Sequence, residues 1–319
     1  MELKKLFGKT LLFGALGMTA IFTGCDKDDD PVVTNTITDV VVNNDNFSTL
    51  ESAVVKANLQ ATLSGAGPFT VFAPDNNAFT ASGITSTVLN SLTQDQVSKI
   101  ILYHALGAKI MAADVPAGPN AKVVTAGGDS VFVTRNASGV YVNGIKVNTA
   151  DVGADNGVIH VIGRVLLPPA GNIVETAVAS GLDSLVKAVT RATTAPGGDP
   201  TLAGTLGSAT LTVFAPTNAA FTQLLSALSM TDINQIPIGT LLAVLRYHVV
   251  GGRAFSSDLS NGNLAMLAGG NTTVNLTGGT GGGPGIRGNG NGGNFSNITA
   301  TNIMCRNGVV HLIDRVLLP

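Results

Sequence analysis

Apolar residues recur at helical spacing near the start of each half of the chain. Residues 48–51, Ser-Thr-Leu-Glu, have the form of a helix capping box, and Asn172 with Glu175 gives the same signal in the second half. The apolar positions that follow fall on one face of an amphipathic helix. They are Leu50, Val54, Ala57 and Ala61 in the first half and Ile173, Ala177, Leu185 and Val189 in the second. We therefore expect each half to begin with an amphipathic helix.

The next pattern predicts a strand that turns directly into a helix. Residues 69–73 are strand-like, and Pro74 ends the strand because proline cannot donate a hydrogen bond to the ladder. Asp75 is placed to cap a short helix that carries Phe79. The same positions in the second half are Pro216, Thr217 and Phe221.

Two further helices are predicted, each ending at a Tyr-His pair. Thr93 with Gln96 opens the first of them, and Pro237 opens the second. Later segments alternate in hydrophobicity between turn residues and predict strands. These segments are 122–125, 130–134, 140–147 and 294–303. Helices thus precede strands in each half, which is the order of an α+β fold.

The chain repeats itself once. Phe-Thr-Val-Phe-Ala-Pro at 69–74 returns as Leu-Thr-Val-Phe-Ala-Pro at 211–216, and the block at 156–168 returns at 307–319. Between them, Tyr103-His104 returns as Tyr247-His248. All four histidines, His104, His160, His248 and His311, fall in paired positions. A period this long, present twice, indicates two tandem domains of one fold, with a boundary near residues 168–171.

These three blocks, in the same order in both halves, resemble the fasciclin-like FAS1 domain. The resemblance covers the chain from about Asn35 to Pro319 and implies an α+β fold. Each domain would be a compact β-sheet wedge with helices packed on it, at residues 37–169 and 170–319. Such domains are usually found outside the cell or on its surface, and they are usually engaged in adhesion rather than catalysis.

The resemblance also suggests binding residues. In this family, adhesion has been attributed to the segment that contains the Tyr-His pair and to the last block. At the matching positions of this chain it points to Tyr103, His104, Tyr247 and His248 as residues that bind a partner. The same residues could instead only hold the fold.

The N-terminus has the pattern of a bacterial lipoprotein signal. Lys4, Lys5 and Lys9 precede an apolar stretch at 11–22, too short to span a membrane, and Phe-Thr-Gly-Cys ends at Cys25. We expect cleavage of residues 1–24 and acylation of Cys25, which would place the protein on a lipid bilayer. The alternative is an ordinary cleaved signal with an incidental cysteine.

Residues 25–36 begin with an acidic run, Asp-Lys-Asp-Asp-Asp, after Cys25. The run is either a solvated tether or an export tag for the surface of the outer membrane. Removing residues 1–24 takes away three lysines and one glutamate, so 15 basic residues stand against 19 acidic ones. That balance excludes the basic footprint of a nucleic-acid-binding protein. We expect an outer-membrane lipoprotein that faces the cell surface, with the periplasm as the alternative.

The sequence contains little that indicates catalysis. Each half has only two histidines, 56 residues apart in the first and 63 in the second, too few for a zinc site. We expect His160 and His311, flanked by apolar residues, to be buried structural residues, and a helix dipole to favour the protonated ring of His104 and His248. Cys305 would be the free thiol of the mature chain and is expected to be a buried small side chain. We expect neither a metal nor a cofactor.

The glycine-rich segment 278–293 is expected to be a flexible loop inserted in the second domain. Its Gly-Pro-Gly-Ile-Arg-Gly at 283–288 formally matches a dinucleotide fingerprint. We reject a nucleotide site because the segment that follows reads as a strand, whereas the fingerprint requires a helix N-terminus.

Taken together, the sequence favours a non-enzymatic surface lipoprotein whose tandem domains bind extracellular protein or polysaccharide. Two modules on one tether could raise avidity if both engage at once. The alternative is a lipoprotein of the cell envelope that captures a glycan or small molecule. A hydrolase using a histidine with Asp151 or Asp155 is disfavoured, because no nucleophile or paired carboxylates stand at a recognisable spacing.

Overall fold

A computed structural model describes residues 35–118 and 120–319 of the chain. The predicted signal peptide at 1–24, the acylated Cys25 and all but the last two residues of the segment 25–36 lie outside the described residues. The described residues up to Leu167 are called repeat 1, and those from Asn172 onward are called repeat 2. Each repeat is described by itself.

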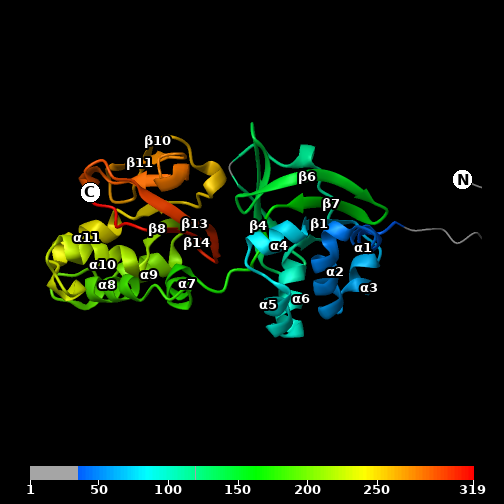
Figure 1. The fold of residues 1–319 in the computed structure, drawn as a ribbon, viewed down its shortest axis with the longest axis horizontal. Helices are drawn as coiled ribbons and strands as arrows, with labels where there is room; N and C mark the ends of the chain where they lie inside the picture. Colours follow the sequence, from blue (N-terminus) through cyan, green and yellow to red (C-terminus); the bar gives the residue numbers. More distant parts are fainter. Residues whose placement is uncertain (1–34, 119) are drawn as a thin grey trace, which may run out of the picture. The chain divides into compact units, whose positions relative to one another are not determined.

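Repeat 1 has six α-helices, three before its first strand in the chain and three after it. Figure 1 shows the helices of each repeat gathered on one side of its strands. The helices are α1 (Ile37–Val42), α2 (Ser48–Lys56), α3 (Gln60–Ser64), α4 (Asn76–Ala81), α5 (Ser86–Ser91) and α6 (Gln94–Tyr103). Strand β1 lies between α3 and α4, and its Pro74 is followed at once by the N-cap of α4, as the sequence predicts.

The sheet of repeat 1 has seven strands in the order β2-β1-β7-β6-β5-β4-β3. Strand β1 pairs in parallel with β7, and the other neighbours pair antiparallel. The strands are β1 (Phe69–Pro74), β2 (Ala105–Leu106), β3 (Ala121–Val124), β4 (Ser130–Asn136), β5 (Gly139–Val142), β6 (Ile145–Ala154) and β7 (Gly157–Ile162).

Repeat 2 has the same topology. Its sheet order is β10-β11-β12-β13-β14-β8-β9, which is the order of repeat 1 read from the other edge, and β8 pairs in parallel with β14. The helices are α7 (Ile173–Ala179), α8 (Asp183–Thr194), α9 (Leu202–Ser208), α10 (Asn218–Ala227) and α11 (Ile238–Arg246). The strands are β8 (Leu211–Pro216), β9 (Val249–Gly251), β10 (Gly262–Ala265), β11 (Asn271–Asn275), β12 (Gly285–Arg287), β13 (Ser296–Cys305) and β14 (Gly308–Ile313). The α+β fold in two tandem copies is thus confirmed.

The central strands separate two hydrophobic cores in each repeat. Successive side chains of a strand point to opposite faces of its sheet. Val71 and Ala73 of β1 accordingly pack in the core beneath the helices, whereas Phe72 packs with Tyr103 in the core on the other face. The parallel strands β1 and β7 are therefore buried on both faces, which explains why most of their residues are apolar.

The first predicted helix differs from the observed one. Residues 48–51 form no capping box: the N-cap of α2 is Phe47, which makes no side-chain cap bond. The backbone N–H of Thr49 instead donates to Oδ1 of Asn76, 3.0 Å away, so a residue from α4 caps this helix. A capping box does occur one helix earlier, at Thr36 and Asp39, where it begins α1.

The long amphipathic helix expected at the start of each half is in fact two or more short helices. Asn58, at φ 56°, separates α2 from α3, and Gly181, at φ 66°, separates α7 from α8. Both residues adopt the left-handed conformation that ends a helix. The capping box at Asn172 and Glu175 is confirmed and begins α7, the counterpart of α1.

The predicted strand 140–147 is a hairpin. Asn143 and Gly144 join β5 to β6 with φ values of 48° and 72°, as a two-residue turn requires. Asn143 is buried, and its Oδ1 accepts a hydrogen bond from the backbone N–H of Phe132 at 2.8 Å.

The glycine-rich segment is ordered, contrary to the expectation of a flexible loop. It contains β12, which occupies the place of β5 between its neighbours and buries Ile286 completely. The buried Asn291 then ties the segment to the C-terminus: its Nδ2 donates to the carbonyl of Val316 at 2.9 Å, and its Oδ1 accepts from the N–H of Leu318 at 3.0 Å. The buried Ile286 and the pairing of β12 with β11 and β13 thus place this part of the segment in the sheet.

Candidate functional site

The Tyr-His pair of repeat 1 lies inside the protein, at the end of α6. The Tyr103 side chain is 1% exposed, and its hydroxyl donates to the carbonyl of Ser130 at 3.0 Å and accepts from Nδ2 of Asn143 at 3.1 Å. Burial raises the pKa of Tyr103 to about 12. The hydroxyl therefore links α6 to β4 and to the β5–β6 turn.

His104 is 2% exposed and bonds the backbone through both ring nitrogens. Nδ1 lies 2.8 Å from the carbonyl oxygen of Ile100, and Nε2 accepts from the backbone N–H of Leu166 at 2.9 Å. A carbonyl only accepts and an N–H only donates, so these partners select the neutral ring with its proton on Nδ1. Burial lowers the pKa of His104 from 6.5 to about 4, which outweighs the helix dipole expected to favour the protonated form.

Repeat 2 reproduces this arrangement. Tyr247 donates its hydroxyl proton to the carbonyl of Asn271. Nδ1 of His248 lies 2.7 Å from the carbonyl oxygen of Val244, and Nε2 accepts from the N–H of Leu317 at 2.9 Å. Burial again lowers the pKa of the histidine, here His248, to about 4.

The second histidine pair holds a bulge in the sheet. Nε2 of His160 lies 2.8 Å from the carbonyl oxygen of Ile110, and Nδ1 accepts from the N–H of Asp151 at 3.2 Å. Asp151 has φ 60° and lies where the register of β6 against β7 shifts. An unpaired backbone N–H at such a bulge thus receives a partner from the facing strand.

The same geometry occurs in repeat 2, where His311 takes the role of His160. Nε2 of His311 lies 2.9 Å from the carbonyl oxygen of Ala254, and Nδ1 accepts from the N–H of Asn302, φ 62°, at 3.3 Å. Its ring stacks on Phe214 at a centroid distance of 5.3 Å. Burial lowers the pKa of His311. His160 and His311 are thus both buried and hydrogen-bonded to the backbone, as predicted from the sequence.

The burial of all four histidines limits what they can do chemically. Both ring nitrogens of each histidine have a backbone partner, so none is left to take a proton from a substrate or to bind a metal. Within residues 35–118 and 120–319, no group of three His, Cys, Asp or Glu side chains is placed to hold a metal ion. A partner could touch Tyr103, His104, Tyr247 or His248 only if the fold opened locally, so direct binding by these side chains stays a prediction that their burial disfavours.

The remaining predicted residues occupy structural positions. Pro74 and Pro216 are the last residues of β1 and β8, opposite Ile162 and Ile313. Cys305 is buried, and burial raises the pKa of its thiol, which makes the reactive thiolate scarcer. Across the described part of the chain, none of the helices has the length and apolar character needed to cross a membrane.

Two structural asparagines were missed at the sequence level. Asn156 accepts from the N–H of Ile37 at 2.9 Å and donates to the carbonyls of Leu63 and Gly65 at 2.8 and 2.9 Å. It thereby joins the start of α1, the end of α3 and the turn before β7. Asn307 makes the equivalent hydrogen bonds in repeat 2. The Asn-Gly pair at 156–157, repeated at 307–308, was the sequence signal that could have identified both asparagines.

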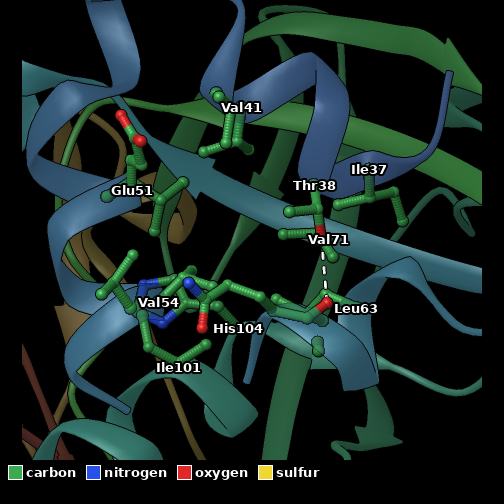
Figure 2. A pocket seen from close by; sticks show the side chains of 14 residues that line it. Ile37, Thr38, Val41, Glu51, Val54, Leu63, Val71, Ile101 and His104 are labelled. Carbon is green, nitrogen blue, oxygen red and sulfur yellow. Dashed lines mark hydrogen bonds between the residues drawn. The ribbon is translucent and has the colours of Figure 1, made fainter. Parts of the chain in front are cut away.

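His104 also forms part of the wall of an apolar pocket beneath the helices of repeat 1. Figure 2 shows this pocket, with Ile37, Thr38 and Val41 on one side and Val54 and Ile101 near the histidine ring. Its volume is about 70 Å³, which is little more than room for a few water molecules. The hydroxyl of Thr38 donates to the backbone carbonyl of Gln60 at 3.3 Å and so links α1 to α3 beside it.

Comparison with known proteins gives two matches to one family model. The model of the Fasciclin domain matches residues 45–168 and 184–319. Protein sll1483 of Synechocystis sp. is 44% identical over 136 residues, which are 42% of this chain and 74% of that protein. Transforming growth factor-beta-induced protein ig-h3 of Sus scrofa is 36% identical over 135 residues, which are 42% of this chain and only 20% of that protein.

Human periostin is 33% identical over 131 residues, which are 40% of this chain and 15% of periostin. A solved FAS1 domain pair, from the insect cell adhesion molecule Fasciclin I, covers 87% of this chain and 98% of that one. Its sequence identity is 17% and its TM-score 0.38, so the evidence for the family lies in the sequence matches.

Proposed function

Because the chain belongs to the Fasciclin domain family and carries two such domains in tandem, we propose that it is a non-enzymatic adhesion protein of the cell surface. In this proposal each domain contributes a binding surface for an extracellular protein or polysaccharide. The observation that carries it is the pair of family matches, since FAS1 domains are known in cell-adhesion proteins.

The hydrogen bonding of the histidines supports a role without catalysis. A general base needs an accepting nitrogen that can reach a substrate proton. In His104, His160, His248 and His311 that nitrogen already accepts a backbone N–H inside the protein. Using one of them as a base would break a hydrogen bond that holds the fold.

In this proposal the Tyr-His pairs position the adhesive surface and do not touch the partner. His104 fixes the start of β2, and the residues that follow β2, Gly107 to Lys109, are exposed. His248 similarly fixes β9, whose last residue Gly251 and the following Gly252 are exposed. A substitution of a buried pair member would therefore weaken adhesion indirectly, by displacing these exposed residues.

The anchor in this proposal is the acylated Cys25, with the acidic run after it as the export tag. Two or three acyl chains on one residue would anchor the protein durably, because each buried methylene contributes about 0.8 kcal/mol. The periplasmic alternative keeps the anchor but turns the two domains inward, where adhesion to another cell is impossible.

Protease shaving of intact cells, followed by immunoblotting, tests the location. We expect loss of the wild-type band from intact cells and protection of a variant in which Asp26, Asp28, Asp29 and Asp30 are replaced by asparagine. Cys25→Ser controls for anchoring and should release the protein from the membrane fraction. Protection of the wild type until the outer membrane is opened would contradict the surface proposal.

Adhesion itself is tested with the same cells. Cells that display the wild type should bind to immobilised extracellular matrix protein or polysaccharide more than cells without the protein. Lys109→Ala, which leaves the buried pair intact, should reduce binding more than Lys56→Ala, whose ammonium is engaged by the carbonyls of Leu89 and Asn90 at 2.8 Å each. Equal binding by cells with and without the protein, on every matrix tried, would contradict adhesion.

A further inference from the structure

Both repeats carry an apolar pocket at the same place, between their first helices and the sheet. In repeat 2 the pocket is lined by α7, α8, α9, β8 and the end of α11. Most of its residues correspond in order to those of the repeat 1 pocket, with His248 in the place of His104, whereas Thr193 and Thr194 have no counterpart in the repeat 1 lining. The correspondence is anchored by equivalent hydrogen bonds, since Asn307 caps Ile173 as Asn156 caps Ile37.

The two pockets differ in size. The cavity volume is about 70 Å³ in repeat 1 and about 230 Å³ in repeat 2. An engineered apolar cavity of about 150 Å³ stays dry and binds benzene, so repeat 2 has room for a larger hydrocarbon. Repeat 1 does not.

Several wall residues differ between the repeats, and three of these differences bear on the size of the cavity. Val41 of repeat 1 is replaced by Ala177, which removes two methyl groups from the wall. Thr38 is replaced by Val174, which has no hydroxyl for the bond that links α1 to α3 in repeat 1. Gln60 is replaced by the smaller Ala203, which shortens the side chain at the edge of the cavity.

The interior of the larger cavity offers a ligand no free hydrogen-bonding group. Its deep wall is formed by aliphatic side chains such as Leu185, Val213 and Leu245. The one ionisable residue is His248, whose two nitrogens bond the backbone of Val244 and Leu317. A polar group placed there would lose its water without gaining a partner.

The edge of the cavity is polar but uncharged. Thr190 and Thr194 are exposed and Thr193 is half-buried, all on the last turns of α8. No Lys, Arg, Asp or Glu lines the cavity. The ligand must therefore combine a hydrocarbon part with an uncharged polar end.

We propose that repeat 2 binds the aliphatic chain of a small uncharged amphiphile, such as a medium-chain alcohol, with its hydroxyl among the threonines of α8. The corresponding pocket of repeat 1, at about 70 Å³, is too small for such a chain. This binding site is additional to adhesion and does not rest on it.

The test measures binding of 1-octanol by calorimetry and by chemical shifts of Val and Leu methyl groups. The protein is the mature chain, residues 25–319, exported with a non-lipoprotein signal and carrying Cys25→Ser so that no acyl chain or detergent competes. We expect one octanol per chain, with shifts at Val186 and Leu206 but not at Val54 and Leu63. 1,8-Octanediol has the same length but a hydroxyl at both ends, and should bind at least tenfold more weakly.

Variants that exchange residues between the repeats test the location. Ala177→Val, alone and combined with Val174→Thr and Ala203→Gln, introduces residues that repeat 1 already holds at these places and should weaken octanol binding at least tenfold. Leu228→Ser, on an exposed residue outside the cavity, should leave binding unchanged. Circular dichroism and urea unfolding establish that each variant is folded.

Several results would overturn the proposal. They are no octanol binding by the wild type, equal affinity for octanediol, two equivalents per chain with shifts in both repeats, and full binding by folded Ala177→Val together with the folded triple variant. If the triple variant fails to fold, Ala177→Val and the comparison of 1-octanol with 1,8-octanediol still test whether the cavity of repeat 2 is the binding site.

Discussion

The imidazole of His104 and the backbone N–H of Leu166 are joined by a 2.9 Å hydrogen bond, although the two residues are 62 positions apart in the chain. His104 is the C-cap of α6, and Leu166 lies after the end of β7. His248 and Leu317 form the same bond at 2.9 Å in repeat 2. Each repeat is thus closed by a histidine that fastens its C-terminal segment to its last helix.

Removing one of these bonds should destabilise its repeat. We expect His248→Ala to leave the N–H of Leu317 buried without a partner and to lower the free energy of unfolding by about 1–3 kcal/mol, before the loss of packing is added. Urea unfolding of the purified protein measures the change. Val178→Thr, at a side chain 58% exposed, is the control and should change stability by less than about 0.5 kcal/mol. Equal stability of His248→Ala and wild type would show that the bond contributes nothing.

Stability should fall as the pH drops from about 6.5 towards 4. The pKa of His104 and of His248 is about 4 in the folded protein against 6.5 as the ordinary value, so the unfolded chain binds more protons in this range. Their contribution is complete above pH 6.5 and decreases below it, by up to about 1.4 kcal/mol per pH unit for each histidine.

Urea midpoints measured between pH 7.5 and pH 4 test this dependence. Asp199, whose pKa is lowered to about 2 by hydrogen bonds from Thr201 and Arg246, titrates below this range and does not interfere. His104→Gln combined with His248→Gln should be less stable at pH 7.5 but should lose less stability on acidification. A slope as steep as that of the wild type would assign the pH dependence to other groups.

The glycine after each structural asparagine should not tolerate alanine. A Cβ on Gly308 would overlap the carbonyl oxygen of Leu211 in the parallel ladder, and one on Gly157 would overlap that of Phe69. We expect Gly157→Ala to cost about 3 kcal/mol of stability, because backbone on a central strand has little room to move. Gly153→Ala is the matched control in β6, where a Cβ meets nothing within 4 Å, and it should be nearly neutral in unfolding experiments.

Asn307→Asp should be strongly destabilising although it preserves the shape of the side chain. Nδ2 of Asn307 donates to the carbonyls of Leu206 and Ala209 at 3.0 and 2.8 Å, and a carboxylate cannot donate to either. We expect a loss of at least about 2 kcal/mol at pH 7, measured by thermal or urea unfolding. The loss should shrink at low pH, where a protonated carboxyl regains one donor. Asn263→Asp, on an exposed residue of β10, should have little effect.

The local elements were the most predictable part of the protein. The strand that ends at Pro74, the helix cap at Asp75 and the helix that begins after Thr93 all depend on residues adjacent in sequence, and all three are confirmed. The internal repeat was equally visible, because two copies of one fold keep the same buried positions. The family could therefore be recognised from these blocks, and the two Fasciclin matches confirm it.

Errors arose where a distant residue decides the local structure. Asn76 caps α2 from another helix, so the Ser48 signal was misleading. The glycine-rich segment became a strand because Ile286 has a place in the core of repeat 2 and Asn291 has partners at the C-terminus. The partners of Asn291, Val316 and Leu318, lie more than 20 residues further along the chain.

The internal repeat, the α+β order and the paired positions of the four histidines can all be read from the chain alone. The apolar neighbours of His160 and His311 already predicted their burial, but the folded protein was needed to show that His104 and His248 are buried too and that every ring nitrogen is bonded to the backbone. It was also needed to show that the pocket of repeat 2 is larger than that of repeat 1. Hydrophobic periodicity and helix caps depend on residues that are neighbours in the chain, whereas burial and cavity volume depend on which side chains come into contact after folding. His104 meets Leu166 and Val174 lies beside α9 only in the folded protein.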